Sequence, residues 1–198
     1  MLAPERIDVQ IPDGATAGAV LLHPHPDYGG DRNNNVVDAL YRALPAAGIA
    51  AVRFDFSSSD LDEGRHDALE ALDLLPTDAV VVVVGYSFGA AVAHGIVGAR
   101  VIGWTLIAAP LGRIGGSGGD AAIALDPRPK LLLVPAHDQY CPPSAARLET
   151  RTWKATTIEE IPSSDHFVAG ATAEIGRRVA SWISAIERRA ARGPTAGR

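Results

Sequence analysis

The sequence is poor in cysteine and in positive charge. Its one cysteine, Cys141, excludes an internal disulfide framework. The 18 Lys and Arg residues against 23 Asp and Glu residues leave a net charge of −5, which supplies no basic surface for nucleic acid or an anionic membrane. No apolar run reaches the roughly 18 to 20 residues of a membrane span, and residues 1–14 show no signal-peptide pattern. We therefore expect a cytoplasmic protein without nucleic-acid or membrane partners, and the composition does not predict its oligomeric state.

Length and composition predict a single domain over residues 1–198, with 192–198 as a flexible tail. A chain of 198 residues that is 47% hydrophobic can bury a sizeable core, and it contains neither a repeat nor a second compositional unit. A glycine-rich stretch at 111–120 predicts a flexible loop.

Hydrophobic patterning predicts an α/β fold. Continuous runs of Val, Ile and Leu are typical of parallel strands covered on both faces, and they lie at 19–22, 49–56, 79–84, 101–108 and 130–135. Amphipathic segments, typical of helices, lie between and after them at 33–47, 60–75, 87–99, 143–151 and 169–189. Residues 6–11 alternate as an antiparallel edge strand would, and 153–161 is a weaker strand candidate. We expect a mostly parallel central sheet of about six to seven strands flanked by helices.

The most specific stretch is Gly85-Tyr86-Ser87-Phe88-Gly89, which satisfies G-x-S-x-G between a predicted strand and a predicted helix. A serine held in such a turn takes a strained backbone, and the flanking glycines allow the strand and the helix to pass closely. The N–H of Phe88, at the helix N-terminus, would stabilise an oxyanion. The alternative is a small-residue turn in which Ser87 only caps the helix.

A serine nucleophile needs a base and an acid. His166 lies in a predicted loop before the last helix and is the candidate base, whereas His66 and His94 fall within predicted helices, where surface or packing roles are expected. Asp138 follows the run at 130–135 and is the candidate acid, although it is also placed to cap a turn or the next helix. Asp165 competes for the acid role.

The second oxyanion donor is expected in the loop that follows the run at 19–22. Pro24 and Pro26 have no N–H, so the first available main-chain donor beyond His23 is that of His25. The order nucleophile, acid, base is that of α/β-hydrolases.

These residues resemble a family of small bacterial α/β-hydrolases, similar to the dienelactone-hydrolase-like and prolyl-oligopeptidase-like branches. The resemblance rests on Leu22-His23-Pro24-His25-Pro26, on Gly29-Gly30 and on Asn33-Asn34-Asn35-Val36-Val37, and it extends from about residue 20 to the final helix. The segment after the second central strand departs from the family, since it reads Arg53-Phe54-Asp55-Phe56-Ser57-Ser58-Ser59-Asp60 where relatives usually carry an Arg-Gly and a further glycine. Dienelactone hydrolases proper use a cysteine nucleophile, and Cys141 lies in the wrong part of the chain for that role.

The resemblance implies a serine hydrolase that cleaves an ester or related acyl bond of a small molecule without a cofactor. It assigns Ser87, Asp138 and His166 as the catalytic residues. The short connection at 109–128 predicts a minimal or absent lid. Tyr28, Tyr86, Tyr140 and Phe167 lie beside the predicted catalytic loops and are expected to bind substrate.

Two alternatives remain open at the level of sequence. One is a metal-dependent hydrolase that uses His23, His25, His137, Asp138 and His166 as ligands. The other is a non-catalytic binding protein that keeps the motif.

Overall fold

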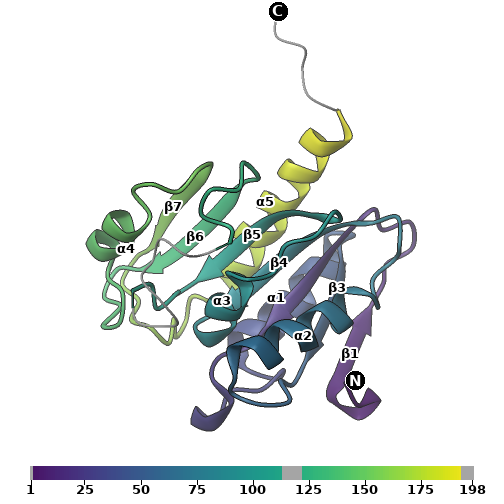
Figure 1. The fold of residues 1–198 in the computed structure, drawn as a ribbon, viewed down its shortest axis with the longest axis horizontal. Coiled ribbons are helices and arrows are strands. Elements are labelled where there is room, and N and C mark those ends of the chain that lie inside the picture. The colour runs from purple at the N-terminus through teal and green to yellow at the C-terminus, as the bar shows by residue number, and fades with distance from the viewer. Residues whose placement is uncertain (1, 113–121, 193–198) are drawn as a thin grey trace, which may run out of the picture.

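Seven strands form one sheet in the order β1-β3-β2-β4-β5-β6-β7 in the described part of the chain (Figure 1). The structure is a computed structural model that describes residues 2–112 and 122–192. Strands β2 to β7 run parallel, and β1 pairs antiparallel with β3 at one edge. The strands are β1 Ile7–Gln10, β2 Ala17–Leu22, β3 Ala50–Phe54, β4 Val80–Tyr86, β5 Val101–Ile107, β6 Lys130–Pro135 and β7 Thr156–Ile161.

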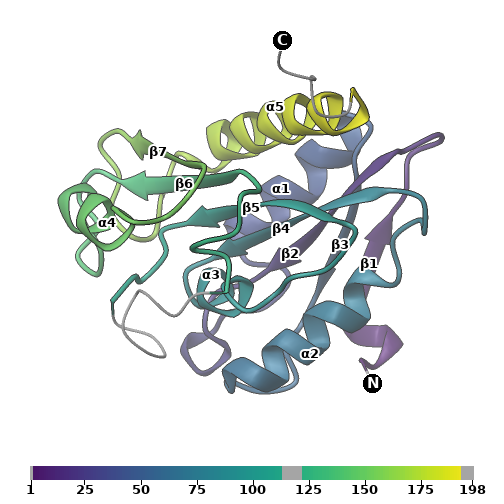
Figure 2. The same ribbon diagram turned by 45° about the horizontal axis from the view of Figure 1, so that its top comes forward.

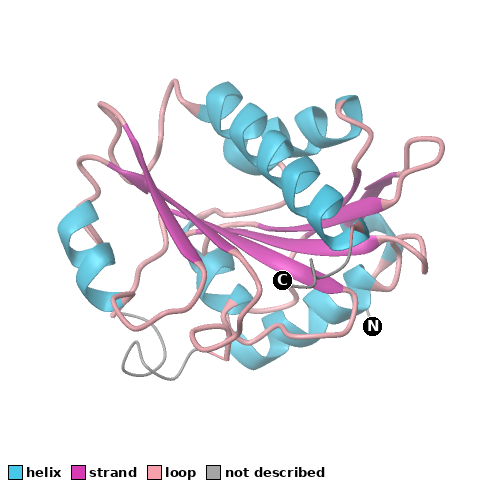
Figure 3. Ribbon diagram, turned by 90° about the horizontal axis from the view of Figure 1, so that it is seen from above, coloured by secondary structure: helices cyan, strands magenta, loops and turns pink. Residues whose placement is uncertain are grey.

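Helices cover both faces of this sheet (Figures 2 and 3). One face packs against α1 and α5, and the other packs against α2 and α3, so two separate apolar cores form. Adjacent residues of β2 divide between them, since Val20 and Leu22 belong to one core and Ala19 and Leu21 to the other. Burial on both faces explains why the apolar runs are continuous. The helices are α1 Asn35–Ala46, α2 Leu61–Leu72, α3 Phe88–Ala93, α4 Pro143–Glu149 and α5 Thr172–Ala191, with 3₁₀ turns η1 Pro4–Arg6 and η2 Pro26–Tyr28.

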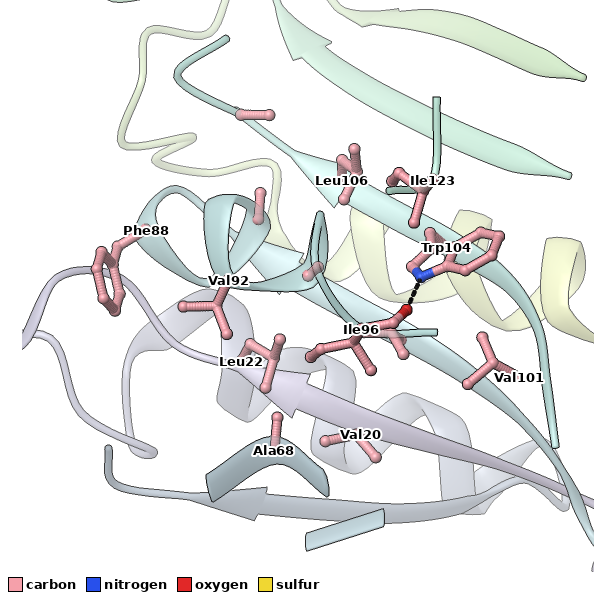
Figure 4. Close-up of a cluster of buried hydrophobic side chains, with 14 of the residues drawn as sticks. Val20, Leu22, Ala68, Phe88, Val92, Ile96, Val101, Trp104, Leu106 and Ile123 are labelled. Carbon is pink, nitrogen blue, oxygen red and sulfur yellow. Dashed lines mark hydrogen bonds between the residues drawn. The ribbon is translucent and has the colours of Figure 1, made fainter. Parts of the chain in front are cut away.

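Trp104 on β5 is the largest fully buried side chain of the core on the α2 and α3 side (Figure 4). Its indole Nε1 donates a 2.9 Å hydrogen bond to the main-chain oxygen of Ile96. This bond satisfies a buried donor and ties the chain just beyond α3 to the sheet.

Lys130 at the start of β6 is fully buried, which is uncommon for lysine. Its ammonium donates to the main-chain oxygens of Asp126 (2.6 Å), Arg128 (2.8 Å) and Lys154 (2.9 Å), so all three N–H groups are used. Burial lowers the pKa of Lys130. The interaction anchors the segments that lead into β6 and β7, the two strands that precede Asp138 and His166.

The strands predicted at 6–11 and 153–161 are confirmed as β1 and β7, although β7 begins only at Thr156. Gly48 takes a positive φ of 79° after α1 ends. The predicted helix at 87–99 is wrong in length, because α3 ends at Ala93. The chain turns there toward Trp104, and Gly95 passes so close to Arg65 that a Cβ would lie 2.2 Å from the guanidinium Nε.

The connection between β5 and β6 contains no helix in its described residues, 108–112 and 122–129, so the lid is minimal there. The predicted loop at 111–120 and the predicted tail at 192–198 lie mostly outside the described residues. Among the helices that the structure describes, none has both the length and the apolar character to cross a bilayer.

Candidate active site

Ser87 occupies a sharp turn between β4 and α3. Its backbone has φ 53° and ψ −114°, a conformation that is strained for any residue with a side chain. The N–H of Ser87 donates to the main-chain oxygen of Ile107 at the end of β5, 2.9 Å away. The turn is thus held at the carboxyl edge of the parallel strands, where α/β sheets place their ligand sites.

The glycines on either side of Ser87 are required by close packing, as predicted. A Cβ on Gly85 would lie 2.3 Å from the oxygen of Gly89, and a Cβ on Gly89 would lie 2.2 Å from the oxygen of Leu22 on β2. Real Cβ atoms essentially never approach backbone so closely. A side chain at either position would force the neighbouring backbone to shift.

His166 meets Ser87 although 79 residues separate them. The imidazole lies in the loop between β7 and α5, is 5% exposed, and has its Nε2 2.9 Å from Ser87 Oγ. The phenol of Tyr86 donates a 3.0 Å hydrogen bond to the main-chain oxygen of His166 and so holds this loop. Burial, followed by the charges of Asp138 and Asp165, raises the pKa of Tyr86 to about 12, which keeps the phenol a donor.

Asp138 lies on the far side of the imidazole and is 2% exposed. Its Oδ2 accepts a 3.0 Å hydrogen bond from His166 Nδ1, while its Oδ1 accepts from the N–H groups of Tyr140 (2.8 Å) and Cys141 (3.2 Å). Asp138 therefore caps this turn and also contacts the imidazole, the position expected of the predicted acid. Asp165 is exposed and accepts from the N–H of Phe167 instead, so it does not orient the ring.

The tautomer of His166 follows from these partners. An ionised carboxylate only accepts hydrogen bonds, so Nδ1 carries the proton shared with Asp138. Nε2 is then the acceptor, directed at the hydroxyl of Ser87. Ser87, His166 and Asp138 form one hydrogen-bonded row with the polarity that proton transfer from the hydroxyl needs.

The loop after β2 is held by both nitrogens of a buried histidine, His23. Nδ1 donates to the oxygen of Pro24 (2.6 Å), and Nε2 accepts from the N–H of Phe56 (3.0 Å). Burial lowers the pKa of His23, consistent with a neutral ring that both donates and accepts. The motif Leu22-His23-Pro24 thus fixes the start of the His25 loop to the loop after β3.

Arg32 anchors the other end of the same loop. Its N–H donates to Asp55 Oδ1 at 2.8 Å, and its guanidinium pairs with the Asp55 carboxylate and with Asp8 Oδ2, the latter at 3.2 Å. The Nε of Arg53 also pairs with Asp8 Oδ2, at 2.8 Å. The segment that departs from the family pattern therefore supports the loop through Asp55, a role that sequence reasoning missed.

A cleft of about 660 Å³ opens beside Ser87, and every residue predicted to bind substrate lines it. Tyr28, Tyr140 and Phe167 lie at its exposed rim, whereas Tyr86 is buried and its hydroxyl is committed to His166. His25 and Phe88, the predicted oxyanion donors, also line the cleft, and their rings are 4.8 Å apart.

The histidines and Asp138 do not form a metal site. Within the described ranges, no three His, Cys, Asp or Glu side chains converge so as to hold a metal ion. His137 is exposed, and both ring nitrogens of His23 are already engaged. The arrangement offers no ligand set for the metal-dependent alternative.

Comparison with known proteins found sequence likeness only over a limited segment. No family model matches the chain. An uncharacterized protein of Rickettsia prowazekii is 35% identical over 91 residues, which are 40% of this chain and 38% of that protein.

Solved structures resemble the chain over nearly its whole length. An alpha-beta serine hydrolase homologue from Coxiella burnetii has a TM-score of 0.77 and 21% identity, and the match covers 91% of this chain and 94% of that one. A serine hydrolase without a lid from Xanthomonas campestris has a TM-score of 0.71 and 25% identity, over 92% and 88%. A dienelactone hydrolase from Anabaena variabilis has a TM-score of 0.72 and 19% identity, over 90% of both.

A mostly parallel seven-stranded sheet, a strained serine turn at its carboxyl edge and these neighbours define the α/β-hydrolase fold. The chain therefore has the fold of a small α/β-hydrolase.

Proposed function

We propose that this protein is a serine hydrolase that cleaves an ester or a related acyl bond of a small molecule through an acyl-enzyme on Ser87, without a cofactor. The observation that carries the proposal is the row Ser87 Oγ to His166 Nε2 (2.9 Å) and His166 Nδ1 to Asp138 Oδ2 (3.0 Å) beside an open cleft. The esterase domain of a Rhodothermus marinus protein, one of the structural neighbours, supports the same reaction class.

In the acylation step, His166 Nε2 takes the proton of Ser87 as the hydroxyl oxygen forms a bond to the substrate carbonyl carbon. The carbonyl oxygen becomes an oxyanion, for which the N–H groups of Phe88 and His25 are the proposed donors. One such donor is worth about 3 kcal/mol of barrier. Asp138 keeps Nδ1 protonated and stabilises the imidazolium.

The intermediate collapses when the bond to the leaving group breaks and His166 returns its proton to that group. The same imidazole then takes a proton from water as the water oxygen attacks the acyl carbon of the ester on Ser87. A second collapse releases the carboxylic acid and restores the hydroxyl of Ser87. Each proton moves through Nε2, so no other acid or base is needed.

A fluorophosphonate probe tests this proposal, because it labels a serine only when a base activates the hydroxyl. We expect stoichiometric labelling at Ser87 in the folded protein and none after denaturation. Hydrolysis of p-nitrophenyl esters of rising chain length should fall at least about a thousandfold in Ser87→Ala. Ser181→Ala, on the exposed face of α5, is the matched control and should keep full activity.

Folded protein that leaves Ser87 unlabelled, or Ser87→Ala that keeps its esterase activity, would overturn the proposal. Activity lost to chelators and restored by a divalent metal would instead favour the metal-dependent alternative. If Ser87 is not labelled and no ester is hydrolysed, the result favours the binding-protein alternative. A cytoplasmic location and a small-molecule partner remain predictions.

A further inference from the structure

The exposed aromatic side chains of the described residues all lie at the mouth of one cleft. Tyr28 is 88% exposed, Phe167 is 60% exposed and Tyr140 is 43% exposed, and each lines the cleft beside Ser87. The other Tyr, Phe and Trp side chains of the sequence are buried or half-buried. Exposed apolar rings gathered at one place mark a binding surface rather than a packing need.

The three rings come from separate loops that meet only in the folded chain. Tyr28 ends η2, Tyr140 follows β6, and Phe167 follows β7. The ring of Tyr28 lies 4.8 Å from that of His25, and the rings of Tyr140 and Phe167 lie 4.5 Å and 5.9 Å from that of His166. All three rings line the cleft that Ser87 also lines.

Fixed charge is absent from the described lining of this cleft. None of the described residues that line it is Asp, Glu, Lys or Arg. The exposed carboxylates of Asp27 and Asp165 directly precede Tyr28 and His166 in sequence, while the nearby guanidinium of Arg32 is paired with Asp8 and Asp55. An anionic substrate would find no cation in this lining and would face acidic neighbours.

We propose that the cleft selects an uncharged ester with a flat apolar acyl group, which stacks between the rim rings, and that it disfavours acyl groups carrying a carboxylate. This inference rests on the proposed serine hydrolase function, since it names the substrate class of the same site. Each stacked ring contributes roughly a two- to tenfold effect on binding.

Three methyl esters of similar size separate flatness from charge: phenylacetate (flat, uncharged), cyclohexylacetate (uncharged, not flat) and 4-carboxyphenylacetate (flat, anionic). The methylene group insulates the ester from the ring, and each kcat/KM is divided by the rate of hydroxide hydrolysis. We expect this corrected kcat/KM to be about tenfold or more higher for the flat uncharged ester than for the other two.

Rim variants test whether the rings cause this preference. Tyr28→Ser and Phe167→Ser should each reduce the ratio of the phenylacetate kcat/KM to the cyclohexylacetate kcat/KM roughly two- to tenfold, mainly through KM. Tyr28→Phe and Phe167→Tyr keep a ring and should keep the ratio. Leu148→Ser on α4, where the leucine is 59% exposed, is the control and should change nothing.

Binding to the inactive Ser87→Ala protein, followed by NMR titration with the same esters, makes the two proposals separable. Suppose that Ser87 is labelled and the esters are hydrolysed. Equal kcat/KM values for all three esters would then overturn the proposed substrate class and leave the serine hydrolase intact. An unchanged ratio of the phenylacetate kcat/KM to the cyclohexylacetate kcat/KM in Tyr28→Ser and Phe167→Ser would do the same. Absent labelling with preferred binding of the flat uncharged ester would overturn the hydrolase and keep the selectivity of the cleft.

Discussion

His94 should make this protein lose stability in mild acid. The residue follows α3 and packs against Trp153, with ring centroids 5.4 Å apart. The residue as a whole is half-buried, yet its Nε2 atom is buried and has no hydrogen-bond partner in the described structure. Burial first, and the positive charge of Arg65 second, lower the pKa of His94 to about 4.

The sign and size of the effect follow from proton linkage. Below pH 6.5 the unfolded chain binds a proton at His94, whereas the folded chain does not until pH falls to about 4. The neutral histidine therefore leaves stability intact above pH 6.5, and stability is lost as the pH falls from 6.5 toward 4. About 2 kcal/mol of unfolding free energy should disappear between pH 7.5 and pH 5 on account of this one residue.

Urea unfolding at several pH values between 7.5 and 5, on the wild type and on His94→Gln, measures this contribution. The glutamine does not titrate, so the variant should lose about 2 kcal/mol less than the wild type over that range. His66→Gln is the control, since His66 is exposed on α2 beside Glu70. Parallel pH dependences in the wild type and in His94→Gln would refute the reasoning.

Two further substitutions test the packing and the positioning of the site. Gly89→Ala would place a Cβ 2.2 Å from the oxygen of Leu22, so urea unfolding should show that the free energy of unfolding falls by about 3 kcal/mol. Gly98→Ala is the control, because its Cβ meets nothing closer than 3.9 Å, and it should lower the free energy of unfolding by under about 1 kcal/mol. Equal losses in the two variants would contradict the packing argument. Tyr86→Phe removes the donor to the oxygen of His166 but keeps the ring in the cleft, so kcat should fall about tenfold with KM unchanged; a change in KM alone would mean that the hydroxyl serves substrate binding instead.

Much of the fold was predictable because its signals are local. The apolar runs became β2 to β6 with boundaries shifted by one or two residues at most sites, and β6 matches its predicted range of 130–135. The error in α3 has a tertiary cause. Residues after Ala93 have helical character in the sequence, but the contact of Gly95 with Arg65 and the bond from Trp104 to Ile96 redirect the chain.

The sequence predicted which residues come together at the site better than it predicted the contacts that each of them makes. Asp138 and His166 were predicted from their places after successive strands, and in the structure His166 contacts Ser87 while Asp138 contacts His166. Tyr86 was expected to bind substrate, whereas its hydroxyl holds the loop of His166. No sequence signal reveals that bond, because its two partners are 80 residues apart.

The sequence by itself determined the parallel strands and the strained turn at Ser87, since hydrophobic runs and flanking glycines act through neighbouring residues. Only the tertiary structure decided which side chains meet at that turn. The order β2-β4-β5-β6-β7 places the carboxyl ends of these parallel strands along one edge, so loops distant in the sequence bring His166 and the three rim rings to one cleft, with Asp138 behind the imidazole. Such contacts depend on strand order and loop geometry, which no short stretch of residues encodes.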